Sequence, residues 1–184
     1  MHRSLKYSFT ALLFFIGGNT FGLGGDFSLT AHDGKTYSLT ESRGNIVLLS
    51  FGYTFCPDIC PTGLATISRA LDSIGDAAQQ VDPLFISVDP DRDTPESLGQ
   101  YARYFHPRLI GLTGDAARIA DIARRYHARF EFVGKGKTPD YTIDHTASLY
   151  VIDRTGKLMT VLPHGLPAQA LAESLMNAIN KPTE

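Results

Sequence analysis

The sequence predicts an α/β fold with a central sheet that is flanked by helices and carries an extra β-hairpin at the N-terminus. Two largely apolar runs, 45–51 and 84–88, have the continuous hydrophobicity of strands that are buried on both faces of a sheet. A stretch with helical spacing of apolar residues follows each run. The segments 27–30 and 36–39 instead alternate between apolar and polar residues, as the two strands of a hairpin do.

The composition is that of a single globular domain. Of the 184 residues, 43% are hydrophobic and 20% are charged, which is enough apolar chain to bury a core. The formal net charge is −2, and the chain contains no block of basic residues. The sequence therefore gives no support for a nucleic-acid partner or for binding to anionic lipid.

The N-terminus, 1–22, has the pattern of an export signal. Arg3 and Lys6 precede an apolar run at 9–16, and small residues then follow at the spacing that a signal peptidase recognises. A membrane anchor is the alternative, because the uncharged stretch approaches the ~20 residues that a spanning helix needs. We therefore expect a signal peptide or anchor, followed by one folded domain at 23–184 in the periplasm, where disulfides persist.

The first elements frame the stretch that holds both cysteines. The N-terminal hairpin turns at 32–35, where a glycine suits the turn. The buried strand 45–51 runs into Cys56-Pro57-Asp58-Ile59-Cys60-Pro61, and a helix is expected from about 62 to 80. Because proline is tolerated only in a first helical turn, this helix should begin between 57 and 61, with Cys56 in the loop before it.

Two further helices and a pair of strands complete the chain. Thr94 has the position of a helix N-cap, with Pro95 at the first helical position, and Asp115 precedes a third helix. Beyond a loop rich in Gly and Lys, we expect two strands and a closing helix, at 148–152, 158–161 and 169–179. A strand–helix–strand unit followed by an antiparallel pair and a last helix is the thioredoxin-like order.

Cys56 and Cys60 are the two cysteines of the chain, and three residues separate them. The common thioredoxin-like redox motif, Cys-x-x-Cys, has two. Residues at this spacing can reach the Cα separation of about 4.4–6.8 Å that a disulfide needs, and a strand-to-helix junction favours thiolates. Two thiolates also favour Cu(I) or Zn(II). The pair is therefore a candidate redox-active disulfide, part of a metal site, or a structural crosslink.

A metal site needs a third ligand, and His145 is the strongest candidate among the six histidines. It precedes the strand expected at 146–152, and in a thioredoxin-like fold the loop that enters this strand faces the thiols. Asp144 is expected to orient the imidazole ring. His164, in a loop between Pro163 and Gly165, is a weaker candidate. The other histidines are expected to be solvated, to cap helices or to leave with the export signal: His2, His32, His106 and His127.

Three motifs stand in a specific order along the chain. Cys-Pro-Asp-x-Cys-Pro occupies 56–61, Asp-Pro-x-x-Asp-Thr-Pro-Glu occupies 89–96, and Asp-Tyr-x-x-Asp-His-Thr occupies 140–146. Together with matches in 24–35, they resemble the SCO/SenC family of copper-binding proteins, which assemble the binuclear copper site of cytochrome c oxidase. The resemblance covers nearly the whole domain. One departure is Phe55, where many members have a histidine.

The resemblance implies that Cys56, Cys60 and His145 bind one copper ion, as Cu(I) or Cu(II). The implied function is a copper chaperone without enzymatic turnover, which delivers copper to the copper-site subunit of the oxidase. Another copper chaperone or a thiol reductase would be a further partner. The alternative is a periplasmic thiol–disulfide oxidoreductase that keeps the cysteines of that subunit reduced. Such a protein would use Cys56 and Cys60 but would not need His145.

Two other hypotheses fit the sequence less well. A peroxidase of the peroxiredoxin kind would need a threonine three residues before Cys60 and a proline four residues before that, but the chain has Pro57 and Tyr53 there. A purely structural disulfide would give no reason for the motif around His145.

Overall fold

The computed structural model describes residues 23–137 and 140–182, so the expected export signal or anchor at 1–22 lies outside the described residues. In chain order, its strands and α-helices are β1 (Ser28–Ala31), β2 (Thr36–Ser38), β3 (Ile46–Gly52), α1 (Ile59–Ser73), β4 (Val81–Ser87), α2 (Pro95–Phe105), β5 (Ile110–Thr113), α3 (Ala116–Arg125), β6 (Phe130–Val133), β7 (Thr142–His145), β8 (Leu149–Ile152), β9 (Leu158–Leu162) and α4 (Ala168–Asn180). Two 3-10 helices are also present, η1 (Leu39–Ser42) and η2 (Gly75–Gln80).

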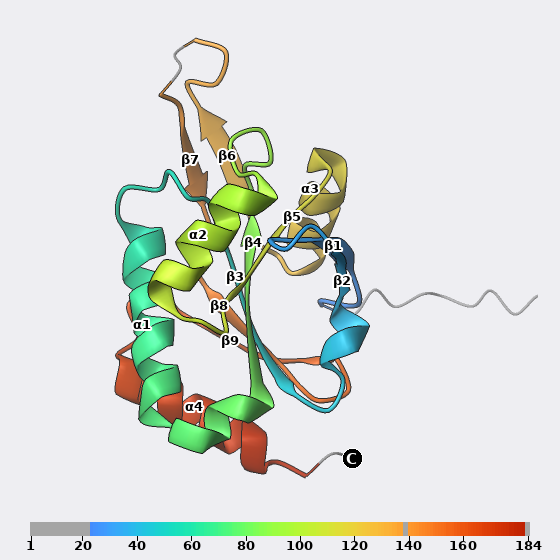
Figure 1. The fold of residues 1–184 in the computed structure, drawn as a ribbon, viewed down its shortest axis with the longest axis vertical. Helices are drawn as coiled ribbons and strands as arrows, with labels where there is room; N and C mark the ends of the chain where they lie inside the picture. The colour runs from blue at the N-terminus through green and yellow to red at the C-terminus, as the bar shows by residue number, and fades with distance from the viewer. Residues whose placement is uncertain (1–22, 138–139, 183–184) are drawn as a thin grey trace, which may run out of the picture.

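The strands form one seven-stranded sheet and one separate ribbon. The order in the sheet is β2-β1-β5-β4-β3-β8-β9, and the ribbon consists of β6 and β7. Strands β3, β4 and β5 are parallel to one another, whereas β8 lies antiparallel to β3 and β1 lies antiparallel to β5. In Figure 1 the ribbon projects beyond the end of the sheet, above the helices α1 and α2.

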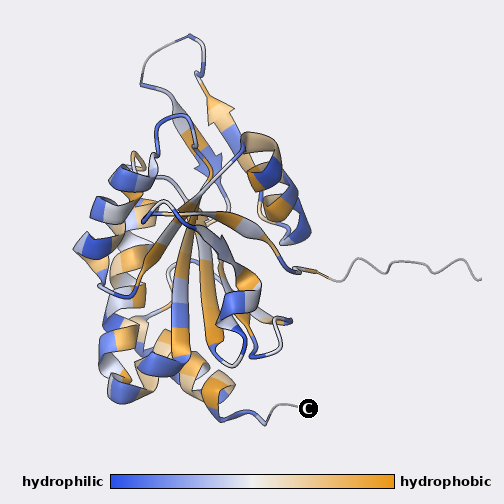
Figure 2. Ribbon diagram, turned by 45° about the vertical axis from the view of Figure 1, so that its right-hand side comes forward, coloured by the Kyte–Doolittle hydropathy of each residue, from blue (hydrophilic) through white to orange (hydrophobic). Residues whose placement is uncertain are grey.

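Strand β3 is the centre of the fold, and all seven of its residues are buried. Alternate residues face the two sides of the sheet, so Ile46 and Leu48 join the cluster under α1, α2 and α4, while Val47 and Leu49 join the cluster under α3. Helices α1, α2 and α4 accordingly cover one face, and α3 covers the other (Figure 1). Figure 2 shows hydrophobic residues concentrated along the central strands.

The predicted α/β fold, its flanking helices and its N-terminal hairpin are confirmed. The predicted caps are also confirmed: the Thr94 hydroxyl accepts a hydrogen bond from Ser97 N, and Asp115 accepts hydrogen bonds from two backbone N–H groups of α3. Among the described residues, no helix combines the length and apolar character that crossing a membrane would need.

Three sequence expectations need correction. The helix expected at 62–80 is two elements, because α1 ends at Ser73 and Gly75, at φ 54°, allows the chain to continue as the 3-10 helix η2. Strand β5 and the ribbon were not expected, since Gly111, Glu131 and Asp144 are of residue types that are depleted in strands. His145 is therefore the last residue of β7, not part of a loop that enters β8.

Candidate metal centre

The cysteine loop connects the end of β3 to the start of α1. Cys56 lies in the loop and Cys60 lies in the first turn of the helix, as expected from the prolines. Both are free thiols and are buried, with exposed fractions of 8% and 6%. The Cys60 N–H donates to Cys56 Sγ at 3.4 Å, so the helix N-terminus already directs one backbone donor at a sulfur.

Gly52, the last residue of β3, leaves the space that Cys60 occupies. A Cβ atom at this position would lie 2.7 Å from Cys60 Sγ and 2.7 Å from the ring of Phe85. Both separations are much shorter than ordinary van der Waals contact. The glycine is therefore required by the close approach of the thiol to the strand.

His145 brings a third donor to the two sulfurs. Its Nε2 lies 3.1 Å from Cys60 Sγ, and the three candidate ligand atoms of Cys56, Cys60 and His145 all lie within 4.8 Å of one another. The three residues that the sequence nominates are therefore brought together. Two come from one loop and helix turn, and the third comes from the ribbon.

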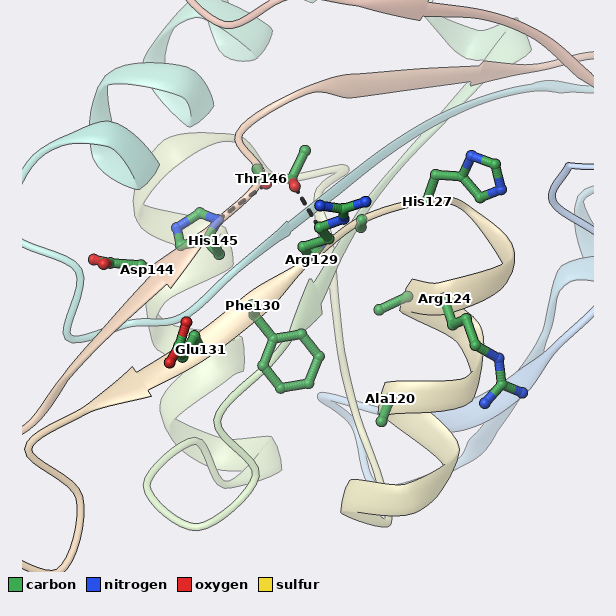
Figure 3. A pocket seen from close by; sticks show the side chains of 11 residues that line it. Ala120, Arg124, His127, Arg129, Phe130, Glu131, Asp144, His145 and Thr146 are labelled. Atoms are coloured by element: carbon green, nitrogen blue, oxygen red, sulfur yellow. Dashed lines mark hydrogen bonds between the residues drawn. The ribbon is translucent and has the colours of Figure 1, made fainter.

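The His145 ring is oriented by its own backbone neighbour. Its Nδ1 lies 3.1 Å from the carbonyl oxygen of Thr146, and because a carbonyl only accepts, Nδ1 carries the proton and Nε2 presents its lone pair to the thiols. The expected orienting role of Asp144 is wrong. In Figure 3 its carboxylate points away from the ring, and its side chain is exposed.

Burial shifts the pKa of two of the three candidate ligands, Cys60 and His145. Burial raises the pKa of the Cys60 thiol, and the hydrogen bond with Cys56 raises it further, which outweighs the thiolate preference expected at the strand-to-helix junction. Burial lowers the pKa of His145, so the imidazole is held in the neutral form that binds metals. A metal ion entering this site would have to displace thiol protons.

The second motif joins the ribbon to the cysteine loop through Arg92. The guanidinium forms an ion pair with the buried Asp89 and donates through Nη1 to the carbonyl oxygen of Tyr141 at 2.9 Å. Its Cζ lies 3.6 Å from the centroid of the Tyr141 ring, and the Tyr141 hydroxyl donates to Asp89 Oδ1 at 2.7 Å. Tyr141 immediately precedes β7, so this network fixes the start of the strand that ends in His145.

The same motif also forms hydrogen bonds with the loop that contains the cysteines, through Asp93. Asp93 is fully buried and accepts hydrogen bonds from the backbone N–H of Thr54 at 3.0 Å, from its hydroxyl at 2.6 Å and from the hydroxyl of Ser87 at 2.6 Å. The neighbouring Tyr53 accepts a hydrogen bond from the backbone N–H of Ile143 at 3.1 Å. Its ring also packs edge-on against His145, with 5.8 Å between centroids.

These supporting residues were missed from the sequence. Arg92 occupies one of the two variable positions of its motif, and only its place between two aspartates gives a signal for an ion pair. Nothing in the sequence indicates that its partner across the ribbon is Tyr141, or that Tyr53 contacts β7. These contacts depend on the path of the ribbon, which the sequence did not predict.

The remaining histidines differ in their surroundings. His32 Nδ1 accepts from Gly111 N at 3.1 Å, and His106 Nδ1 accepts from Arg108 N at 3.2 Å, so both stabilise turns. His106 is buried rather than solvated, and burial lowers its pKa. His127 and His164 are exposed, and His2 lies outside the described residues.

The sequence and the structure both match known proteins. The family model SCO1/SenC matches residues 18–180. The chain belongs to the SCO1/SenC family. It is 38% identical over 138 residues to SCO2-like protein RC0895 of Rickettsia conorii. This alignment covers 74% of this chain and 67% of that protein. It is 39% identical over 139 residues to the mitochondrial protein SCO1 homolog of Homo sapiens. That alignment covers 74% of this chain and 46% of the human protein.

Solved structures of this family share the fold. The structure of Bradyrhizobium japonicum ScoI with copper bound has a TM-score of 0.79 and 40% sequence identity, and the alignment covers 85% of this chain and 99% of that chain. Arabidopsis thaliana ScoI with copper bound also has a TM-score of 0.79, with 34% identity, and 86% of this chain and 98% of that chain are covered. The expected thioredoxin-like fold and the resemblance to the SCO/SenC family are confirmed.

The role of Arg92 leads to a prediction about stability. Arg92→Met should destabilise the protein by about 3 kcal/mol or more, because it leaves the Asp89 carboxylate buried without its cation. The change in the free energy of unfolding is measured by urea denaturation monitored with circular dichroism. Arg124→Met is the matched control, since Arg124 forms an ion pair with Asp121 on the exposed surface and should cost no more than about 1 kcal/mol. Equal losses in the two variants would contradict the role assigned to Arg92.

Proposed function

We propose that the protein is a copper carrier that binds one copper ion through Cys56, Cys60 and His145 and delivers it to the binuclear copper site of cytochrome c oxidase. The observation that supports this most strongly is the convergence of two thiols and a neutral imidazole within 4.8 Å of one another. The similarity to ScoI proteins whose structures contain bound copper supports the choice of metal.

The donor set fits both oxidation states of copper. Thiolates are soft ligands that favour Cu(I), and an imidazole suits either state. Two sulfurs and one nitrogen give Cu(I) a near-trigonal site, whereas Cu(II) can add a further donor. The thiols must be reduced and must lose their protons before copper binds, so metal uptake depends on the redox state of the pair.

The position of the site suits transfer to another protein. The cysteines are buried, but His145 is only partly buried and lies at the end of the sheet from which the ribbon projects. Phe55, next to Cys56, is 59% exposed and offers an apolar contact beside the site. A partner that docks here can replace the ligands one at a time with its own thiolates and imidazoles.

The copper-site subunit of the oxidase is the proposed recipient of the copper. A second copper chaperone would load the site, or a thiol reductase would reduce it.

We also propose that the domain acts in the periplasm. The export pattern at 1–22 supports this location, with the segment serving either as a cleaved signal peptide or as an anchor, and the domain 23–184 then lies outside the cytoplasm. In that compartment the cysteine pair can be oxidised, so a partner that reduces it is needed before copper is bound.

A thiol–disulfide oxidoreductase is the second candidate. The proximity of Cys56 Sγ and Cys60 Sγ, which lie within 4.8 Å of one another, supports it, because a movement of the loop can bring the two sulfurs to bonding distance. In this chemistry the reduced pair gives two electrons and two protons to a disulfide of the oxidase subunit and becomes a disulfide itself. The two candidates differ in His145, which contributes no group to that exchange.

The copper site leads to a binding prediction. Reduced protein should bind one copper per chain, and His145→Ala should weaken Cu(I) binding by more than about 100-fold, since a lost ligand costs at least as much as a lost outer-sphere partner. Competition with a Cu(I) chelator measures the affinity. His127→Ala removes an exposed histidine near the same ribbon and should bind like wild type. If His145→Ala also binds like wild type, the three-ligand site is wrong.

A deletion strain separates delivery from reduction. Without the gene, oxidase activity should fall, and added copper should restore it, because excess metal bypasses a carrier. Oxidase activity of isolated membranes is the measurement. A strain that a membrane-permeant thiol reductant restores, and that copper does not, would instead support the oxidoreductase.

A further inference from the structure

His164 lies beside the candidate copper site but is not part of it. It belongs to the loop between β9 and α4, and it lines a small cavity of about 20 Å³ whose wall also includes Cys60 and His145. The remaining wall comes from α1, from the strands β3, β4 and β8, and from the residue Ala147. His164 therefore shares a cavity wall with two of the candidate ligands, but it is not in the group whose ligand atoms lie within 4.8 Å of one another.

The His164 ring is free to bind. Within 23–137 and 140–182, no side-chain hydrogen bond or ion pair engages it, in contrast to His32 and His106, whose Nδ1 atoms accept from backbone N–H groups. His164 is also exposed. It is thus an uncommitted imidazole at the edge of a thiol site.

The three inner donors leave one position that the two copper states use differently. Cu(I) is satisfied by two thiolates and one imidazole, whereas Cu(II) prefers a tetragonal set with a fourth donor. We propose that His164 is a movable fourth ligand, which binds Cu(II) held by Cys56, Cys60 and His145 and leaves the ion when it is Cu(I). This inference rests on the proposed copper site and adds a ligand to it.

The surroundings allow the ring to approach. The shared cavity has room for only about one water molecule, so the ring would reach the site by movement of its loop and not by filling existing space. Gly165 follows directly, at φ 80°, and no heavy atom lies within 4 Å of the position where its Cβ would be. The loop can therefore change its path at this residue at little steric cost.

A ligand that binds only one oxidation state changes the balance between the two. Since His164 would stabilise Cu(II) and not Cu(I), it would lower the reduction potential of the bound ion. One electron from a thiol reductant, which is itself oxidised towards a disulfide, would convert bound Cu(II) to Cu(I), and His164 would then leave the ion with three ligands. Transfer of Cu(I) to a partner would begin from this more open state.

Electron spin-echo spectroscopy on protein loaded anaerobically with one equivalent of Cu(II) counts the imidazoles bound to the ion. Wild type should show two, and His164→Ala should show one. His164→Ala should also weaken Cu(II) binding by about 10-fold or more while its Cu(I) affinity, from chelator competition, stays within about 2-fold of wild type. His127→Ala, which removes an exposed histidine from a different groove next to His145, should retain two imidazoles and both affinities.

A single imidazole in wild type, or two in His164→Ala, would overturn the assignment of His164. Equal weakening of Cu(I) and Cu(II) binding in His164→Ala would also overturn it, because the residue would then not discriminate between the two states. These failures differ from failure of the copper site itself, in which wild type would bind neither ion.

Discussion

The buried contact between Asp89, Arg92 and Tyr141 connects the two parts of the chain that form the candidate copper site. The site takes two thiols from a loop on the main sheet and an imidazole from a ribbon that is a separate sheet. Nothing in the pairing of the main strands fixes the position of the ribbon. Arg92 supplies one link, because its guanidinium pairs with Asp89 and contacts the carbonyl and the ring of Tyr141. The hydrogen bond from Ile143 N to the Tyr53 hydroxyl supplies another. Buried charges interact strongly at low dielectric, so a small network can hold this position.

The parallel pairing of β3 and β4 explains why motifs far apart in the chain meet. The cysteine loop follows β3, and the Asp89–Asp93 segment follows β4, so both begin at the same edge of the sheet. Asp93 then binds Thr54 of the cysteine loop, and Arg92 reaches the ribbon on the other side. The second motif therefore has no ligand of its own but connects the two motifs that do. Gly52 adds a packing constraint, since only a glycine lets the Cys60 sulfur lie against β3.

Much of this arrangement follows from local sequence signals. The continuous apolar run of β3, the cap at Thr94 and the prolines around the cysteines predict their elements because each depends on neighbouring residues. The three candidate ligands were also predicted, because the chain has only two cysteines and only six histidines, and the two cysteines and His145 lie in recognisable motifs. The ribbon, the Arg92 network and the carbonyl of Thr146 as the partner of His145 were not. The hydrogen bonds that position the ribbon join residues 49 and 90 positions apart, Arg92 with Tyr141 and Tyr53 with Ile143. The contact of His145 with the Thr146 carbonyl joins adjacent residues, but it depends on a backbone conformation that the residue types do not specify.

The raised pKa of the Cys60 thiol, the neutral imidazole of His145 and the partial exposure of that imidazole describe the site before the proposed metal ion binds. The most direct test is X-ray absorption spectroscopy at the copper edge on Cu(I)-loaded protein, because it counts the sulfur and nitrogen atoms bound to the metal. A site made of Cys56, Cys60 and His145 predicts two sulfur neighbours and one nitrogen neighbour. A shell of sulfur atoms alone, or one of nitrogen and oxygen without sulfur, would contradict it.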